Sequence, residues 1–206
     1  MHTVHLAIDA ILANAKAFNP RAKIADIDLR SALHALFDEL ARSEVDYLLV
    51  GVALLSFVEG RNTQDVDLII GPDDALRTLR SASFRDRDFG SATFHGVNVD
   101  LLLTTNELFS YVRAHERTTI SFDGRTIPSA SREGLILLKL YALPSLYRQG
   151  KLDRAALYET DIKMLHQNVA IDDDRLLSML AGHLAAHDVQ ELRNILEEQR
   201  RHRRFT

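Results

Sequence analysis

Residues 47–70 read YLLVGVALLSFVEGRNTQDVDLII, and this stretch decides the fold. The apolar run at residues 47–50 is rich in strand-forming residues and predicts a buried strand. Gly51 ends that run, and residues 52–58 are apolar enough to form a short helix packed over the strand. A second strand is expected at residues 65–70, because a Gly-Pro pair follows it and stops the ladder.

Three aspartates interrupt this apolar pattern. Asp65 and Asp67 stand at i and i+2 of the second strand, so their side chains point to the same side of the sheet. Asp100 is a single acid in another apolar strand, at residues 97–103. Neighbouring carboxylates repel each other and are costly to desolvate, and a divalent metal offsets both effects. The alternative is that Asp65 caps a turn while the other two are edge residues with arginine partners.

This order of residues resembles the nucleotidyltransferase (polymerase beta-like) superfamily. Its signature is a glycine turn, a helix, an Asp-hydrophobic-Asp strand and a later third carboxylate. The matching positions here are Gly51, Ala53, Leu54, Arg61, Thr63, Asp65, Val66, Asp67 and Leu68. The family places two adjacent glycines, or Gly-Ser, at the turn, whereas Val50 and Val52 flank the single glycine here.

The C-terminal half extends the likeness. Residues 135–141 and 161–165 resemble the AbiEii and MenT toxin branch of the same superfamily, so the resemblance covers roughly residues 45–167. It implies an α+β fold, with a nucleotidyltransferase-like mixed sheet flanked by helices and a helical C-terminal part. It also implies a metal-dependent enzyme that moves an NMP from an NTP to an acceptor hydroxyl.

The resemblance assigns the acids to metal binding and catalysis. Asp65 and Asp67 would hold two Mg²⁺ or Mn²⁺ ions, and Asp100 would bind the ion on the nucleophile side and accept a proton. Such ions lower the pKa of an attacking hydroxyl and neutralise a leaving pyrophosphate.

The same likeness assigns residues to the nucleotide. Gly51, Arg61, Thr63 and Lys139 would bind the NTP, with the lysine on the triphosphate. Asp161 would orient that lysine or assist the acceptor.

Lys139 and Asp161 are also candidate residues independently of the family resemblance. The lysine stands in a helix that is apolar on nearly all sides, and the aspartate interrupts an apolar stripe. Charged side chains are almost never fully buried unless paired, so the two are expected to pair. A structural salt bridge between two helices and a catalytic role both remain open.

The remaining chain supplies the rest of the fold. Domain boundaries are expected at residues 1–130, a nucleotidyltransferase-like core with N-terminal helices, and 131–206, a helical region, with one continuous domain as the alternative. A proline is expected to end or kink the helix that begins near residue 131. Helices are expected at residues 3–18, from residue 28 and at residues 73–83, and hairpins about Gly96 and Asp123-Gly124.

The composition excludes several classes of protein and of metal site. The 206 residues are 46% hydrophobic and 26% charged, with a net charge of −4 and no cysteine. Disulfides and thiolate metal sites are therefore excluded, and no apolar run reaches the ~18 residues of a membrane span. We expect a cytoplasmic protein without membrane contact. The net acidity argues against a protein that coats nucleic acid non-specifically.

Three functions compete at this stage. The first is nucleotide transfer to a tRNA or other RNA end, a protein or a small molecule, with a role in a toxin–antitoxin or phage-defence system and a cognate antitoxin as partner. The second is a catalytically inactive nucleotidyltransferase-like module that binds or regulates, and the single glycine at the turn favours it. The third is an interaction protein without nucleotide, which requires all three acids to be salt-bridged.

Overall fold

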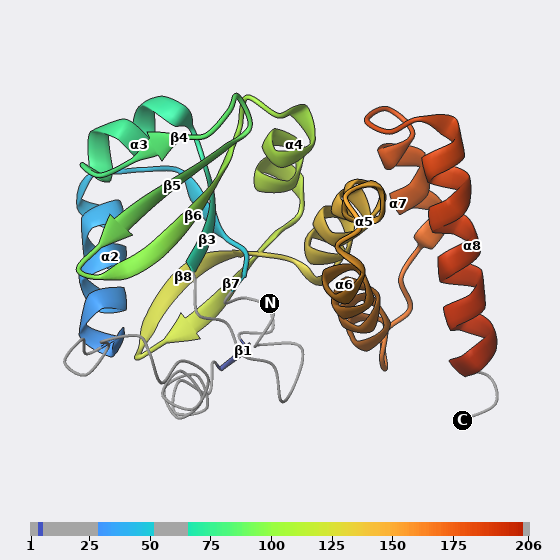
Figure 1. The fold of residues 1–206 in the computed structure, drawn as a ribbon. Coiled ribbons are helices and arrows are strands. Elements are labelled where there is room, and N and C mark those ends of the chain that lie inside the picture. Colours follow the sequence, from blue (N-terminus) through green and yellow to red (C-terminus); the bar gives the residue numbers. More distant parts are fainter. Residues whose placement is uncertain (1–3, 6–28, 52–65, 204–206) are drawn as a thin grey trace. The chain divides into compact units, whose positions relative to one another are not determined.

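The computed structural model describes residues 4–5, 29–51 and 66–203. The chain divides into two compact units, residues 1–131 and 132–206. The first unit contains the sheet and its flanking helices, and the second is helical (Figure 1). This arrangement confirms the predicted α+β class, a mixed sheet flanked by helices followed by a helical C-terminal part.

The described residues of the first unit form one mixed sheet in the order β1-β7-β8-β2-β3-β6-β5-β4. Three helices accompany it. The strands are β1 Val4–His5, β2 Tyr47–Leu49, β3 Val66–Ile70, β4 Ser83–Phe84, β5 Phe89–Phe94, β6 Val97–Leu103, β7 Arg117–Phe122 and β8 Arg125–Ala130, and the helices are α2 Leu29–Arg42, α3 Pro72–Thr78 and α4 Glu107–His115. Strand β3 runs antiparallel to β2 and parallel to β6, so it joins the two halves of the sheet.

Two tight hairpins form where the sequence predicts them. His95 and Gly96 have φ values of 46° and 82°, and Asp123 and Gly124 have 46° and 79°. Positive φ at both central residues is the type I′ geometry, whose twist matches that of the flanking strands. The turns connect β5 to β6 and β7 to β8, and they fix the register of each pair.

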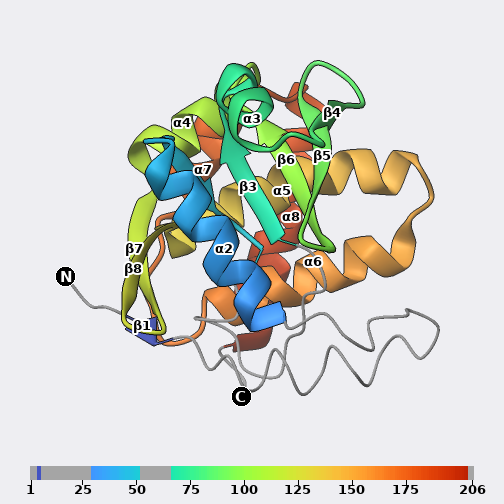
Figure 2. The same cartoon turned by 90° about the vertical axis from the view of Figure 1, so that its left-hand side faces the viewer.

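The main core of this unit lies on one face of the sheet. Helix α2 supplies the apolar stripe of Leu33, Leu36, Phe37 and Leu40, and all four side chains are buried. They pack with every second residue of β3 and β6, as the period of a strand requires. Helix α2 covers this face, and α4 lies on the opposite side of the sheet (Figures 1 and 2).

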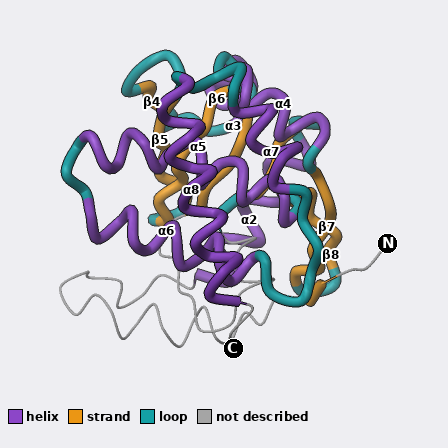
Figure 3. Tube along the Cα trace, turned by 90° about the vertical axis from the view of Figure 1, so that its right-hand side faces the viewer, coloured by secondary structure: helices purple, strands orange, loops and turns teal. Residues whose placement is uncertain are grey.

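The second unit is built from four helices. They are α5 Arg132–Arg148, α6 Leu152–Leu165, α7 Asp173–Leu180 and α8 Ala186–Arg203. Helices α5 and α6 pack as an antiparallel pair, and α7 packs on α8 (Figure 3). Helix α5 is apolar on nearly all sides, with buried residues on every turn, which is typical of a helix at the centre of a unit.

Some local expectations are wrong. Val4–His5 form a strand that pairs in parallel with β7, so the expected helix cannot begin at residue 3. Of the two outcomes expected at the proline, an end of the helix is wrong, because α5 continues through Pro144 to Arg148. Packing around an apolar helix outweighs the loss of one backbone donor. The rest of the expected N-terminal helix and the helix at residues 52–58 lie outside the described residues.

Within the part of the chain that the structure describes, no helix has both the length and the apolar character needed to cross a membrane.

Candidate active site

Asp67 and Asp100 lie side by side on neighbouring parallel strands. Asp67 of β3 and Asp100 of β6 are Cα partners in the register. Partners in a ladder project their side chains from the same face, and adjacent strands are about 4.8 Å apart. The sheet therefore brings together two of the three predicted metal ligands.

The acids lie on the face opposite the main core. Val66 and Leu68, which flank Asp67, are buried in that core, and so are Val99 and Leu101, which flank Asp100. Asp67 is half-buried and Asp100 is exposed. The strands are therefore held firmly by their apolar residues, while the carboxylates between them face the open side. Such a site is rigid at its base and accessible from solvent.

Gly51 lies directly against the carboxylate of Asp67. A Cβ atom at this position would come within 1.7 Å of Oδ2 and 2.8 Å of Cγ of Asp67. The backbone continues the contact, because the amide of Val50 donates to the carbonyl oxygen of Asp67 at 2.9 Å. The glycine thus leaves the space that the carboxylate occupies, a role that the sequence did not reveal.

Three predicted site residues, Asp65, Arg61 and Thr63, lie outside the described residues. Within the described ranges, no group of three histidines or acids could hold a metal ion. The described part of the site is therefore a pair of carboxylates on a fixed frame. Carboxylate oxygens suit hard cations such as Mg²⁺ and Mn²⁺, and two in register can share one, so the residues present fit such an ion.

Lys139 and Asp161 belong to the helical unit and contact each other, as expected. Lys139 Nζ on α5 donates to Asp161 Oδ2 on α6 at 2.8 Å. The ammonium also lies 4.3 Å from the ring centroid of Tyr158, within range of a cation–π interaction. The Asp161 side chain is fully buried and that of Lys139 is 13% exposed. The pair joins the two helices, and its role in catalysis stays a prediction.

A second polar cluster in the helical unit was not predicted. His166 and Asp173 are both buried, and His166 Nε2 lies 2.7 Å from Asp173 Oδ1. The other ring nitrogen lies 2.7 Å from the carbonyl oxygen of Ile162, and Arg200 donates to Asp173 Oδ2 at 2.8 Å. The partners of Asp173 are 7 and 27 residues away along the chain, so no local sequence pattern points to this cluster.

Asp173 carries a shifted pKa. Burial alone would raise the pKa of this carboxyl, but the hydrogen bond and charge of His166, and then those of Arg200, hold the pKa below its ordinary value of 3.8. The carboxylate is therefore stabilised in its charged form by His166, the residue that follows α6, and by Arg200 of α8.

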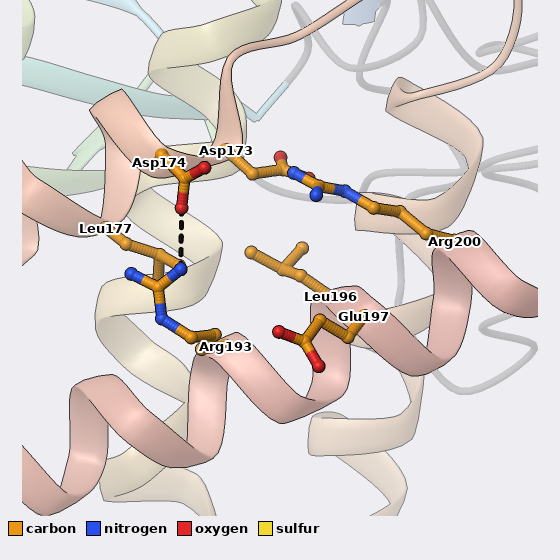
Figure 4. A pocket seen from close by; sticks show the side chains of 7 residues that line it. All are labelled: Asp173, Asp174, Leu177, Arg193, Leu196, Glu197 and Arg200. Atoms are coloured by element: carbon orange, nitrogen blue, oxygen red, sulfur yellow. Dashed lines mark hydrogen bonds and ion pairs between the residues drawn. The ribbon is translucent and has the colours of Figure 1, made fainter.

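A small pocket beside this cluster lies between α7 and α8 (Figure 4). Its volume is about 120 Å³, enough for a few water molecules but not for a nucleotide. Arg193 bonds Asp174 at 2.6 Å across it. The lining residues are Asp173, Asp174, Leu177, Arg193, Leu196, Glu197 and Arg200. These ion pairs hold the two helices together, and we assign the pocket no catalytic part.

Comparisons with known proteins support the fold. No protein-family model and no curated protein matches the chain. A solved structure of an antigenic nucleotidyltransferase-like protein from Paracoccidioides brasiliensis matches with a TM-score of 0.52 and 16% identity, over 82% of this chain and 92% of that one. A candidate nucleotidyltransferase from Thermotoga maritima matches with a TM-score of 0.39 and 15% identity, over 62% of this chain and 88% of that one, too weakly to support an argument. The chain therefore has a fold similar to that of a nucleotidyltransferase-like protein.

Proposed function

We propose that this protein is a metal-dependent nucleotidyltransferase, which moves an NMP from an NTP to an acceptor hydroxyl. The observation that carries the proposal is the register of β3 and β6, which sets Asp67 beside Asp100 on an accessible face. The fold, similar to that of a nucleotidyltransferase-like protein, supports the same conclusion.

The described acids have distinct parts in the proposed reaction. Asp67, held in place over Gly51, binds a divalent ion together with Asp65. Asp100, which is more exposed, binds the ion on the acceptor side and accepts the proton of the acceptor hydroxyl. When bound, Mg²⁺ or Mn²⁺ supplies charge that lowers the pKa of the attacking hydroxyl and stabilises the leaving pyrophosphate.

Residues outside the acid pair complete the proposal. Arg61, Thr63 and Gly51 bind the NTP in this proposal. For Lys139 and Asp161, the buried contact between α5 and α6 supports the structural alternative, a salt bridge between two helices. The acceptor in our proposal is an RNA end such as that of a tRNA, within a toxin–antitoxin or phage-defence system.

A transfer assay tests the proposal. The protein is incubated with Mg²⁺, each of the four α-labelled NTPs in turn, and total cell RNA, and the label is followed into RNA, protein and small molecules. We expect Asp67→Asn to lower transfer by about 100-fold or more, since removing one stabilising group from a transition state has that effect. Asp74→Asn is the matched control, because Asp74 pairs with Arg77 on α3 and takes no part in the site.

Two outcomes would count against transfer. Metal-dependent NTP binding without labelled product would support the inactive binding module. Absence of both binding and transfer in the parent protein would exclude both hypotheses.

A further inference from the structure

The register extends the acid pair into a row across four strands. Asp100 of β6 is the Cα partner of Ser91 of β5 on the side away from Asp67, and Ser91 is in turn the partner of Ser83 of β4. Partners in a ladder share a face, so the four side chains stand in one line at strand spacing. One edge of the proposed site is therefore lined by hydroxyl groups.

On this side the sheet is open at Ser91, Thr93 and Asn98, whereas α4 covers another part of the same face. Ser91 and its neighbour Thr93 are exposed on β5, and so is Asn98 on β6, which is the partner of Thr93. The alternate residues Ala92 and Val99 are buried in the core on the other face. The exposed positions thus have a rigid base and a free surface, which is what a subsite for a second substrate needs.

One cation, Arg85, borders this surface, which is otherwise neutral beyond Asp100. Among the described residues on the open face of β5 and β6 there is no lysine, arginine or histidine. The guanidinium of Arg85 lies 5.1 Å from the centroid of Phe89, at the end of β5. The hydroxyl and amide groups of Ser91, Thr93 and Asn98 suit a neutral group that carries hydroxyls, since phosphate recognition relies on arginine, lysine or backbone amides.

We propose that Ser91 is a positioning residue for the acceptor. This assignment rests on the proposed function. Its hydroxyl holds the hydroxyl-bearing sugar of the acceptor beside Asp100. The reacting hydroxyl gives its proton to Asp100, its oxygen forms a bond to the α-phosphorus of the NTP, and the bond from that phosphorus to the bridging oxygen breaks. Pyrophosphate leaves with that electron pair. The strip of Ser91, Thr93 and Asn98 thereby determines which acceptors fit.

Steady-state kinetics test this assignment. Ser91→Ala, Ser91→Thr and the parent are compared with Mg²⁺ and labelled NTP, using total RNA or adenosine as the ribose-bearing probe. Periodate-oxidised RNA, which lacks the terminal diol, shows whether an RNA end supplies the sugar. We expect Ser91→Ala to raise the KM for the acceptor about three- to tenfold, the effect of one lost hydrogen bond, with NTP binding unchanged. Ser91→Thr keeps the hydroxyl and should restore the parent value.

Ser83→Ala is the matched control, because Ser83 shares the row but is one strand further from Asp100. It should behave like the parent. An unchanged acceptor KM in Ser91→Ala, or a loss of NTP binding in the same proportion, would overturn the assignment while leaving transfer itself established. A parent protein that labels only protein acceptors, with the same kinetics in Ser91→Ala, would also overturn it. A parent that transfers nothing refutes the proposed function and this assignment together.

Discussion

The buried aspartates of the helical unit and the pair of aspartates on β3 and β6 are placed differently. The helical unit buries three aspartates, each beside a cation: Asp161 with Lys139 at 2.8 Å, Asp173 with Arg200 at 2.7 Å and Asp188 with Arg148 at 2.8 Å. In the sheet unit, the register instead sets Asp67 next to Asp100, carboxylate beside carboxylate. An acid matched to a cation can stabilise a fold, whereas two adjacent acids repel unless a further positive charge joins them.

This contrast separates two uses of the same residue type. The helical acids connect α6 to α5, α7 to α8 and α8 to α5, so they account for how four helices pack. Asp67 and Asp100 lie on strands that their buried apolar neighbours already hold in the sheet. Removing a helical acid or its partner should therefore cost stability, and removing a sheet acid should cost function.

Lys139→Met is expected to have the largest effect on stability. The substitution leaves Asp161, whose side chain is fully buried, without its ammonium partner. Breaking a buried pair in this way costs about 3–5 kcal/mol. Denaturant unfolding monitored by circular dichroism measures the loss. The double change Lys139→Met with Asp161→Leu should recover most of it, because no buried charge then remains.

The matched control for Lys139 is Arg193→Met. Its partner Asp174 has a side chain that is 69% exposed, so the expected loss is only about 0.2–1 kcal/mol. If Lys139→Met leaves stability unchanged and weakens NTP binding, the lysine acts on the triphosphate and the helical acids are not purely structural.

Asp173→Asn should have the second-largest effect on stability, and this effect depends on pH. The folded-state pKa of Asp173 is held below 3.8, so its contribution is present above that pH and is lost as pH falls through the folded-state pKa. At neutral pH the loss of charge-assisted hydrogen bonds to His166 and Arg200 should cost on the order of 1.5–3 kcal/mol. The difference in unfolding free energy between parent and variant should shrink as pH falls below 3.8 and through the folded-state pKa. A difference that does not change with acidification would show that Asp173 is not the titrating group.

Gly51→Ala should affect the site more than the fold. The added methyl group would lie 1.7 Å from Asp67 Oδ2, and the carboxylate can move away by rotating its side chain. We expect about a tenfold weaker Mn²⁺ affinity, measured by calorimetry in the presence of NTP, with a small change in melting temperature. Gly182→Ala is the control, because its Cβ would meet only Met179 O at 3.6 Å. Unchanged Mn²⁺ affinity in Gly51→Ala would remove Asp67 from the metal site.

Local chemistry made much of this fold predictable from sequence. Apolar runs ended by glycine located β2 and β3, and the two-residue turns at Gly96 and Gly124 located both hairpins. The apolar run at residues 97–103 located β6 and placed Asp100 within it. Counting back from the turn at Gly96 would also have placed Ser91 opposite Asp100, a step that needs only the hairpin register.

Other features depend on contacts that no local pattern encodes. The sheet order places the β7–β8 hairpin beside β2, and nothing in either segment specifies that neighbour. The space for the Asp67 carboxylate over Gly51 appears only when both strands are in place. His166, just after α6, and Arg200 of α8 both contact Asp173, so the surroundings of this carboxylate depend on tertiary packing. Leu157 lies four residues before Asp161, the spacing of one helix face, and is nevertheless 40% exposed.

The most direct test of the contrast is thermal melting of Asp100→Asn and Asp161→Asn, each in chelator and in Mn²⁺. We expect Asp100→Asn to melt at or above the parent in chelator, because one of two neighbouring charges is gone, and to gain nothing from Mn²⁺, which stabilises the parent. Asp161→Asn should melt below the parent in both conditions and still gain from Mn²⁺. The account is contradicted if Asp100→Asn melts clearly below the parent in chelator and Mn²⁺ leaves the parent unchanged.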